Sequence, residues 1–275
     1  MMGDKLFLNM KEDHVVLFAD ILGFSEAVKK NESVTIHDKG GIIVNFPRIY
    51  QIFVETYSKE YQEHLGIKLL WVSDSVIVSA PIANVDAIFF VLNDFTNQMY
   101  CSGLPLRGVI TVGKLYHEDN VWGPALVEAV EDEKNRAKYP RVILKKEYVD
   151  KLSINPQYRQ YIVESDIEDY CQYEFLDQNM DDFKNRGADM TASLSVYSQF
   201  VGRQYKENPL PSVKEKYKWL AKKLLDAVNR HSTYIDEYVS ANERWSTISG
   251  EAERLTSHIP FKVYLEKIVQ DGVMP

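Results

Sequence analysis

The amino-acid sequence predicts an α+β fold in which a ferredoxin-like, antiparallel-rich sheet carries covering helices and is followed by a helical C-terminal extension. Short apolar runs rich in β-branched residues alternate with amphipathic helical patterns up to residue 152. Two of these runs are joined by the sequence Ser-Asp-Ser, which indicates a β-hairpin. The last third has the apolar stripe of a packed helix. The predicted order up to residue 152 is therefore β-α-β-β-α-β-α-β.

The predicted strands carry acidic residues where they end or turn. The run HVVLFADI is expected to form a buried strand from His14 to Ile21, with Asp20 near its end and Gly23 in the next turn. The run IKLLWVSDSVIV, residues 67–78, is expected to form the hairpin, with Asp74 in its turn. Further strands are predicted over 106–115 and 141–144, and the sequence YHEDN, residues 116–120, is expected to be a solvated loop.

Helical patterns separate these strands. They are predicted over 47–64, 86–101, 124–138 and 146–152. In the second of them one face is apolar and consists of Ile88, Val91, Leu92, Phe95 and Met99. Such a face predicts that this helix packs on the sheet.

The chain changes character after residue 152, and we expect a domain over 1–152 and a mixed, then helical, extension over 153–275 packed on it. Residues 153–175 are polar and aromatic, with one more strand expected over 172–176. Residues 177–190 have the composition of a loop. Ser212 and Glu215 match a capping box at the start of a C-terminal helix, whose apolar stripe is Val213, Tyr217, Leu220, Leu224 and Val228.

Bulk properties exclude several classes of function. The formal net charge is −8, and an acidic chain without a basic arm is a poor non-specific nucleic-acid binder. No apolar run approaches the roughly 20 residues that span a bilayer, so no membrane segment is expected. Cys101 and Cys171 lie far apart with no CxxC pattern, which predicts reduced packing residues in a cytoplasmic protein.

Two aspartates carry the strongest chemical signal. Asp20 lies at the end of one apolar strand and Asp74 in the turn between two others, and in a ferredoxin-like sheet these segments can be neighbours. Two carboxylates with a strand-end carbonyl, such as that of Ile21, suit Mg²⁺ or Mn²⁺, and two such ions support phosphoryl chemistry. The plainer interpretation stays open: an aspartate at a strand end is more often a turn or cap residue, and Ser-Asp-Ser can satisfy its own backbone.

Four segments resemble, in the right order, motifs of the class III adenylyl and guanylyl cyclases. FADILGFS resembles their F-x-D-I-x-G-F-S/T motif, and VSDSVIV resembles their Gly-Asp hairpin with Ser73 in place of the glycine. LRGVITVG resembles their arginine-containing strand, with Val109 at the middle glycine, and WGPALVEA resembles the W-G-x-x-V-N-x-A start of the helix that lines the active site. The four segments are residues 18–25, 72–78, 106–113 and 122–129.

The resemblance implies a set of site residues. The family's metal ligands fall on Asp20, Asp74 and the carbonyl of Ile21, which hold two Mn²⁺ or Mg²⁺ ions per active site. The positions that surround the triphosphate fall on Phe18, Gly23 and Phe24. Arg107 is a further candidate for holding a phosphate or a pyrimidine carbonyl, with a surface arginine at a strand start as the equal alternative. Lys138 is a basic candidate for offsetting leaving-group charge, although such a lysine is more often solvated than catalytic.

The chain departs from the family at the residues that read a purine and stabilise the transition state. The family's transition-state Asn and Arg fall on Val127 and Glu131, and its base-reading Lys and Asp fall on Leu70 and Asn120. Further resemblance, in GPALVEA, YPRVIL and KEKYKWL, is to the bacterial pyrimidine cyclases of Pycsar antiphage defence. It implies a homodimer with active sites at the subunit interface that converts UTP or CTP into cyclic UMP or cyclic CMP, read by a separate effector.

Three alternatives follow from the same residues. Val127 and Glu131 also suit a catalytically dead nucleotide-binding sensor on this fold. An adenylyl or guanylyl cyclase with unusual base contacts is the second alternative. A palm-type polymerase is the third, and the acidic charge argues against it.

Overall fold

The structure is a computed structural model of the 275-residue chain, and it describes residues 12–25, 51, 53, 64–101, 104–186, 191–237 and 258–270. The chain divides into two compact units, residues 1–175 and residues 176–275. The first unit holds the sheet and the second is helical. Each is described by itself below.

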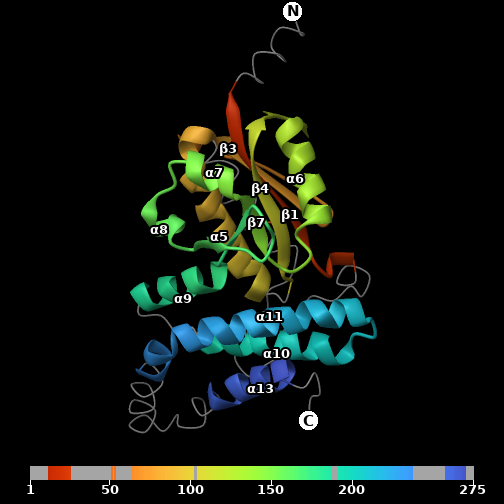
Figure 1. The fold of residues 1–275 in the computed structure, drawn as a ribbon, viewed down its shortest axis with the longest axis vertical. Helices are drawn as coiled ribbons and strands as arrows, with labels where there is room; N and C mark the ends of the chain where they lie inside the picture. The colour runs from red at the N-terminus through yellow and green to blue at the C-terminus, as the bar shows by residue number, and fades with distance from the viewer. Residues whose placement is uncertain are drawn as a thin grey trace, which may run out of the picture. The chain divides into compact units, whose positions relative to one another are not determined.

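A seven-stranded sheet forms the first unit (Figure 1). Its strands are β1 (Asp13–Ile21), β2 (Lys68–Val72), β3 (Ser75–Pro81), β4 (Leu106–Lys114), β7 (Val142–Lys145), β8 (Ile162–Glu164) and β9 (Tyr170–Tyr173). They lie in the order β2-β3-β1-β4-β7-β9-β8, and every pair is antiparallel except β4 with β7. The mixed, mostly antiparallel sheet with covering helices confirms the predicted fold class.

Helices cover both faces of this sheet. The helices whose bounds lie within the described part of the first unit are η1 (Ile82–Asn84), α5 (Val85–Cys101), α6 (Pro124–Asn135), α7 (Lys146–Lys151) and α8 (Pro156–Arg159). Val16 of β1 packs with Ala125 of α6. Because side chains alternate along a strand, Val15, Leu17 and Ala19, all fully buried, face the other side, where α5 contacts β1, β3 and β4.

The face under α5 holds the main core. Phe53 stacks on Phe95 of α5 with ring centroids 4.2 Å apart, and both rings meet Trp71 of β2 edge-on. The predicted apolar face of α5 is confirmed, because Ile88, Val91, Leu92, Phe95 and Met99 are all fully buried. Of the helix predicted over 47–64, only residues 51, 53 and 64 are described, and they are helical.

The loop expected at residues 116–120 is instead a small hairpin, which consists of β5 (Tyr116–His117) and β6 (Val121–Trp122). His117 is buried at 6% exposure and shares a 2.7 Å hydrogen bond between its Nδ1 and the hydroxyl of Ser79 on β3. The expectation of a solvated loop is therefore wrong at His117. The burial of His117 could not be predicted from the local sequence, because its hydrogen-bond partner Ser79 lies 38 residues away.

The region after residue 152 also differs from expectation. Strands β8 and β9 belong to the sheet of the first unit, and the strand expected over 172–176 begins at Tyr170 and ends at Tyr173. The expected loop over 177–190 is helical through Arg186 as α9 (Phe175–Arg186), and residues 187–190 lie outside the described part. The polar composition of this segment did not indicate a helix. A few of its side chains are nevertheless buried, such as Phe175, whose ring centroid lies 4.6 Å from that of Tyr100.

The second unit consists of packed helices. Helices α10 (Thr191–Glu207), α11 (Pro211–Arg230) and α13 (His258–Gln270) contact one another pairwise. In the predicted stripe of α11, Tyr217, Leu220, Leu224 and Val228 are buried. The predicted capping box is wrong, because the helix begins at Pro211 after Leu210 and no side chain caps its first turn; proline at the first helical position replaces that cap. Among the residues described, no helix is long and apolar enough to cross a bilayer.

Candidate metal and nucleotide site

The two aspartates of the predicted site lie next to each other at one end of the sheet. In the β1–β3 pairing Asp20 is opposite Ser75, the residue after Asp74. The backbone N–H of Ile21 donates a hydrogen bond of 2.7 Å to the carbonyl oxygen of Asp74. The β2–β3 turn therefore brings Asp74 to the end of β1, beside Asp20 and the carbonyl of Ile21.

The turn itself is built by a strained residue. Ser73, which stands where the cyclase motif has glycine, adopts a φ of 57°, a left-handed conformation that few residues other than glycine, asparagine and aspartate favour. The indole N–H of Trp71 donates a 2.8 Å hydrogen bond to the Ser73 carbonyl oxygen and braces it. The carboxylate of Asp74 makes no hydrogen bond or ion pair with any residue that the structure describes. In particular, it does not hydrogen-bond to the described backbone of the β2–β3 turn.

Arg107 lies between two carboxylates. It is the direct partner of Asp20 in the β1–β4 pairing, and its Nη2 lies 3.2 Å from Asp20 Oδ2. Its Nε forms an ion pair with Oε1 of Glu133 on α6. The Arg107 side chain is 20% exposed and that of Glu133 only 8%. The end of β1 therefore has the acidic residues Asp20 and Asp74, with the Arg107 guanidinium beside Asp20.

The three positions that the resemblance assigns to the triphosphate lie in and just after β1. Phe18 is partly buried and packs on Val16 and Ile77 under α6. Gly23 is exposed and has a φ of 83°, and a Cβ added there would meet no atom within 4 Å. Glycine therefore suits this turn because it readily adopts a positive φ, and not because a side chain would lack space. Phe24 is half-buried and begins a helical turn directly after Gly23.

Lys138 is an exposed residue of the loop between α6 and β7, with its ammonium 5.2 Å from the centre of the Tyr139 ring. This loop reaches the sheet at the end where Asp20 lies, because Val142 of β7 pairs with Gly108, next to Arg107 on β4.

The four positions that depart from the family's motifs have ordinary surroundings. Val127 is 57% exposed and Glu131 is exposed on α6. Leu70 packs on the apolar cluster of Val16 and Ile77. Asn120 is exposed in the β5–β6 turn. None of them supplies a charge that replaces the one lost, so any substitute must come from other residues.

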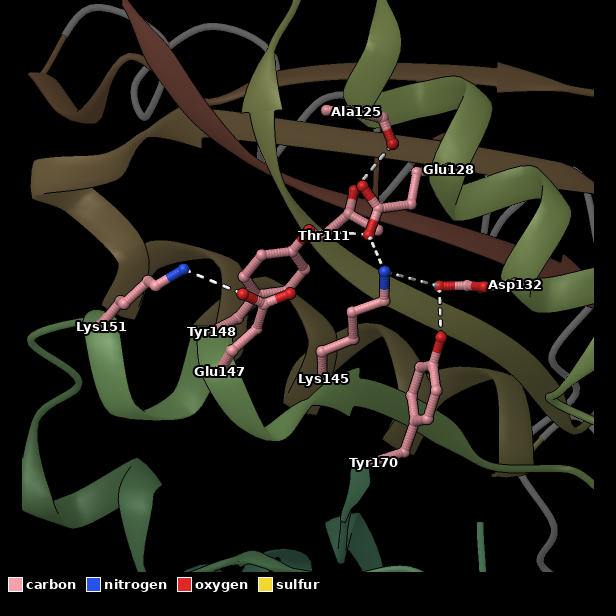
Figure 2. Close-up of polar contacts among 9 residues, drawn as sticks. All are labelled: Thr111, Ala125, Glu128, Asp132, Lys145, Glu147, Tyr148, Lys151 and Tyr170. Carbon is pink, nitrogen blue, oxygen red and sulfur yellow. Dashed lines mark hydrogen bonds and ion pairs between the residues drawn. The ribbon is translucent and has the colours of Figure 1, made fainter. Parts of the chain in front are cut away.

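Sequence reasoning missed a second polar cluster on the α6 face (Figure 2). Glu128 Oε1 accepts hydrogen bonds of 2.7 Å from Lys145 Nζ and from the Tyr148 hydroxyl. Asp132, one helical turn on, accepts 2.7 Å from the Tyr170 hydroxyl and lies 3.9 Å from Lys145 Nζ. The only sequence signal was Glu128 and Asp132 at i, i+4 on a predicted helix, which by itself indicates a solvated face.

This second cluster borders a cavity of about 570 Å³ lined by Asp132, Arg136, Lys145, Lys146, Glu147, Glu168, Asp169 and Tyr170. The hydrogen bond from Lys145 to Glu128 raises the pKa of Lys145, so this ammonium stays charged. Burial, followed by the hydrogen bond to Glu128, raises the pKa of Tyr148. The polar groups of this cluster are hydrogen-bonded to one another. Through Glu128 they link α6 to Lys145 of β7 and to Tyr148 of α7.

A divalent cation suits the first site by the chemistry of its donors. Two aspartates and one backbone carbonyl are hard oxygen ligands of the kind that Mg²⁺ and Mn²⁺ take, with substrate oxygens and water completing the shell. In the described part of the chain no group of three or more His, Cys, Asp or Glu side chains forms a ready cation cage.

No protein-family model matches the chain, and no curated protein matches it. Solved structures do show partial similarity. The adenylyl cyclase CyaB from P. aeruginosa has 18% identity and a TM-score of 0.34, over 58% of this chain and 91% of that one. A bacterial light-regulated adenylyl cyclase has 15% identity and a TM-score of 0.30, over 49% and 76%. An adenylate/guanylate cyclase/hydrolase from Silicibacter pomeroyi has 13% identity and a TM-score of 0.34, over 58% and 93%.

Proposed function

We propose that this protein is a metal-dependent nucleotidyl cyclase. The single observation that carries the proposal is the hydrogen bond from Ile21 N–H to the Asp74 carbonyl, which brings two carboxylates from separate segments to one end of the sheet. Because a buried or strand-end charge is costly unless it is paired or metal-bound, the juxtaposition of two aspartates favours a cation site over two independent turns.

In this proposal Asp20, Asp74 and the Ile21 carbonyl hold two Mn²⁺ or Mg²⁺ ions. When bound, the ions would favour loss of the proton from the ribose 3′-hydroxyl and offset charge on the phosphates. The 3′-oxygen forms a bond to the α-phosphorus, the bond from that phosphorus to the bridging oxygen breaks, and pyrophosphate leaves. Phe18, Gly23 and Phe24 surround the triphosphate, and Arg107 and Lys138 contribute positive charge.

The proposed substrate is a pyrimidine nucleoside triphosphate, with UTP preferred over CTP. Leu70 and Asn120 stand where purine cyclases read their base, and neither offers the lysine–aspartate pair. The product would be cyclic UMP or cyclic CMP, a second messenger in antiphage defence that a separate effector reads. We also propose that the enzyme is a cytoplasmic homodimer with active sites at the subunit interface.

The direct test incubates the purified full chain with each of the four ribonucleoside triphosphates and Mn²⁺, and measures cyclic nucleotide and pyrophosphate. Consumption of UTP or CTP is expected, and Asp74→Asn is expected to abolish it. A folded protein that cyclises none of the four contradicts the proposal. Preference for ATP or GTP would instead identify a purine cyclase.

A catalytically dead sensor is the second candidate, because the exposed α6 positions hold Val127 and Glu131 rather than the family's Asn and Arg. Saturable triphosphate binding without pyrophosphate release would favour it over the cyclase.

A further inference from the structure

One face of α6 contains an acidic residue where an apolar one is expected. The buried residues of this helix are Ala125, Ala129 and Glu133, spaced four apart, so all three face the sheet. The two alanines let the helix lie close to the strands. Glu133 has the same orientation but is a carboxylate at 7% exposure. Burial of an ionised carboxylate is costly unless a cation pairs with it, so this residue needs a specific partner.

That partner is Arg107, which lies at the proposed metal site. Glu133 contacts the Nε of the guanidinium, and Asp20 lies 3.2 Å from Nη2 of the same group. Arg107 therefore has a buried carboxylate on one side and the candidate metal ligand on the other. The two carboxylates compete for one positive charge.

We propose that Glu133 is a positioning residue that holds and neutralises Arg107, and thereby keeps Asp20 available to a divalent cation. With Glu133 ionised, a large share of the Arg107 charge is balanced inside the protein. Without the Glu133 carboxylate, the Arg107 guanidinium would compete with the divalent cation for the Asp20 carboxylate. The positive charge of Arg107 would then also repel a cation that binds a few ångströms away. The inference rests on the proposed metal site.

Removal of the Glu133 charge is expected to weaken metal binding. Glu133→Gln keeps the shape of the side chain and is expected to weaken Mn²⁺ binding by about five- to tenfold, measured as free Mn²⁺ by electron paramagnetic resonance without any nucleotide. The matched control is Glu128→Gln, which removes the same charge from the same helix but breaks a contact with Lys145 instead. This control is expected to bind Mn²⁺ within about twofold of wild type.

A double variant separates this role from a purely structural one. Arg107→Gln combined with Glu133→Gln removes both charges, so the guanidinium no longer competes for Asp20, and Mn²⁺ affinity is expected to return to within about twofold of wild type. If Glu133→Gln binds Mn²⁺ as tightly as wild type, or no more weakly than Glu128→Gln, the inference is overturned. If Glu133→Gln does not fold, Arg107→Gln alone is expected to bind Mn²⁺ more tightly than wild type, and an unchanged affinity overturns it.

Asp20→Asn keeps the failure of this inference distinct from failure of the proposed function. It is expected to lose Mn²⁺ binding. If wild type binds no Mn²⁺, or if Asp20→Asn binds it equally well, the proposed metal site is refuted. The proposed role of Glu133 is then refuted as well, because it depends on that site. If Asp20→Asn loses binding while Glu133→Gln is unaffected, only the role of Glu133 is refuted.

Discussion

The backbone N–H of Ile21 donates a 2.7 Å hydrogen bond to the carbonyl oxygen of Asp74. This contact joins the end of β1 to the β2–β3 turn, and it fixes Asp20 and Asp74 as neighbours although they come from separate segments. The same end of the sheet carries Arg107 and Glu133. Metal binding is therefore expected to depend on these two aspartates and on the Arg107–Glu133 ion pair.

Loss of either aspartate is expected to remove metal binding without unfolding the protein. Asp20→Asn and Asp74→Asn each replace a ligand while keeping its volume, and loss of a ligand should cost activity at least as much as the roughly 10–100-fold seen for outer-shell partners. The Asp20–Arg107 pair is partly buried, with side chains 22% and 20% exposed, and its loss is expected to cost about 1 kcal/mol of stability. Cyclic nucleotide formation and thermal unfolding measure the two effects.

Asp13→Asn is the control for that experiment. Asp13 also lies on β1 and also pairs with a β4 cation, Lys114, with Lys114 Nζ 2.9 Å from Asp13 Oδ1, but at the other end of the strand. It is expected to leave activity and Mn²⁺ binding unchanged. Equal losses from Asp13→Asn and Asp20→Asn would mean that general charge, not ligation, was responsible.

A methyl group at Gly108 is expected to destabilise the central strands. A Cβ at this position would lie 2.6 Å from the carbonyl oxygen of Phe18 and 3.1 Å from Cα of Ala19, and backbone atoms cannot retreat cheaply. Gly108→Ala should therefore lower the free energy of unfolding by about 1–3 kcal/mol, measured by urea denaturation.

Gly113→Ala is the matched substitution on the same strand. Its Cβ would approach that of Ala125 only to 3.4 Å, so the change in stability is expected to stay below about 1 kcal/mol. If Gly108→Ala proved as harmless as Gly113→Ala, the close packing of β1 on β4 described here would be wrong.

Stability is expected to fall in acid through His117. Burial, then the positive charge of Lys68, lowers the pKa of His117 to about 4 from its ordinary 6.5. The folded state therefore binds fewer protons than the unfolded state between these values, and the stabilisation present above pH 6.5 is lost as pH falls towards 4. It amounts to about 3 kcal/mol in all, of which about 2 is lost by pH 5.

Urea unfolding at pH 7.5 and pH 5 measures this effect of His117. His117→Gln should remove most of the difference between the two pH values, whereas His64→Gln, at an exposed histidine, should retain it. An equal pH dependence in wild type and His117→Gln would contradict the assignment.

The hydroxyl of Tyr148 is expected to stabilise the first unit through Glu128. It donates a 2.7 Å hydrogen bond to a carboxylate that also pairs with Lys145, so Tyr148→Phe should cost about 1.5 kcal/mol of unfolding free energy. Tyr116→Phe is the control, because the ring of Tyr116 packs on Trp122 and that contact survives the substitution. A loss in the control as large as that in Tyr148→Phe would show that the ring rather than the hydroxyl matters.

Much of the fold was predictable because its elements have clear local patterns. The strand ending at Asp20, the hairpin around Asp74 and the apolar face of α5 all follow from alternation or helical periodicity. The failures have a common cause. His117 and Phe175 contact partners that are distant in sequence, Ser79 and Tyr100, and the local sequence around each is polar.

The sequence by itself indicated the candidate residues: two aspartates at a strand end and a hairpin turn, a glycine turn at Gly23 and an arginine at a strand start. Only the tertiary structure decided which of them meet. Register places Asp20 opposite Arg107 and Ile21 against Asp74, and helix α6 adds the buried carboxylate of Glu133. The physical reason is that charge and hydrogen-bond partners depend on distance in space, and a chain fixes that distance only when its strands pair.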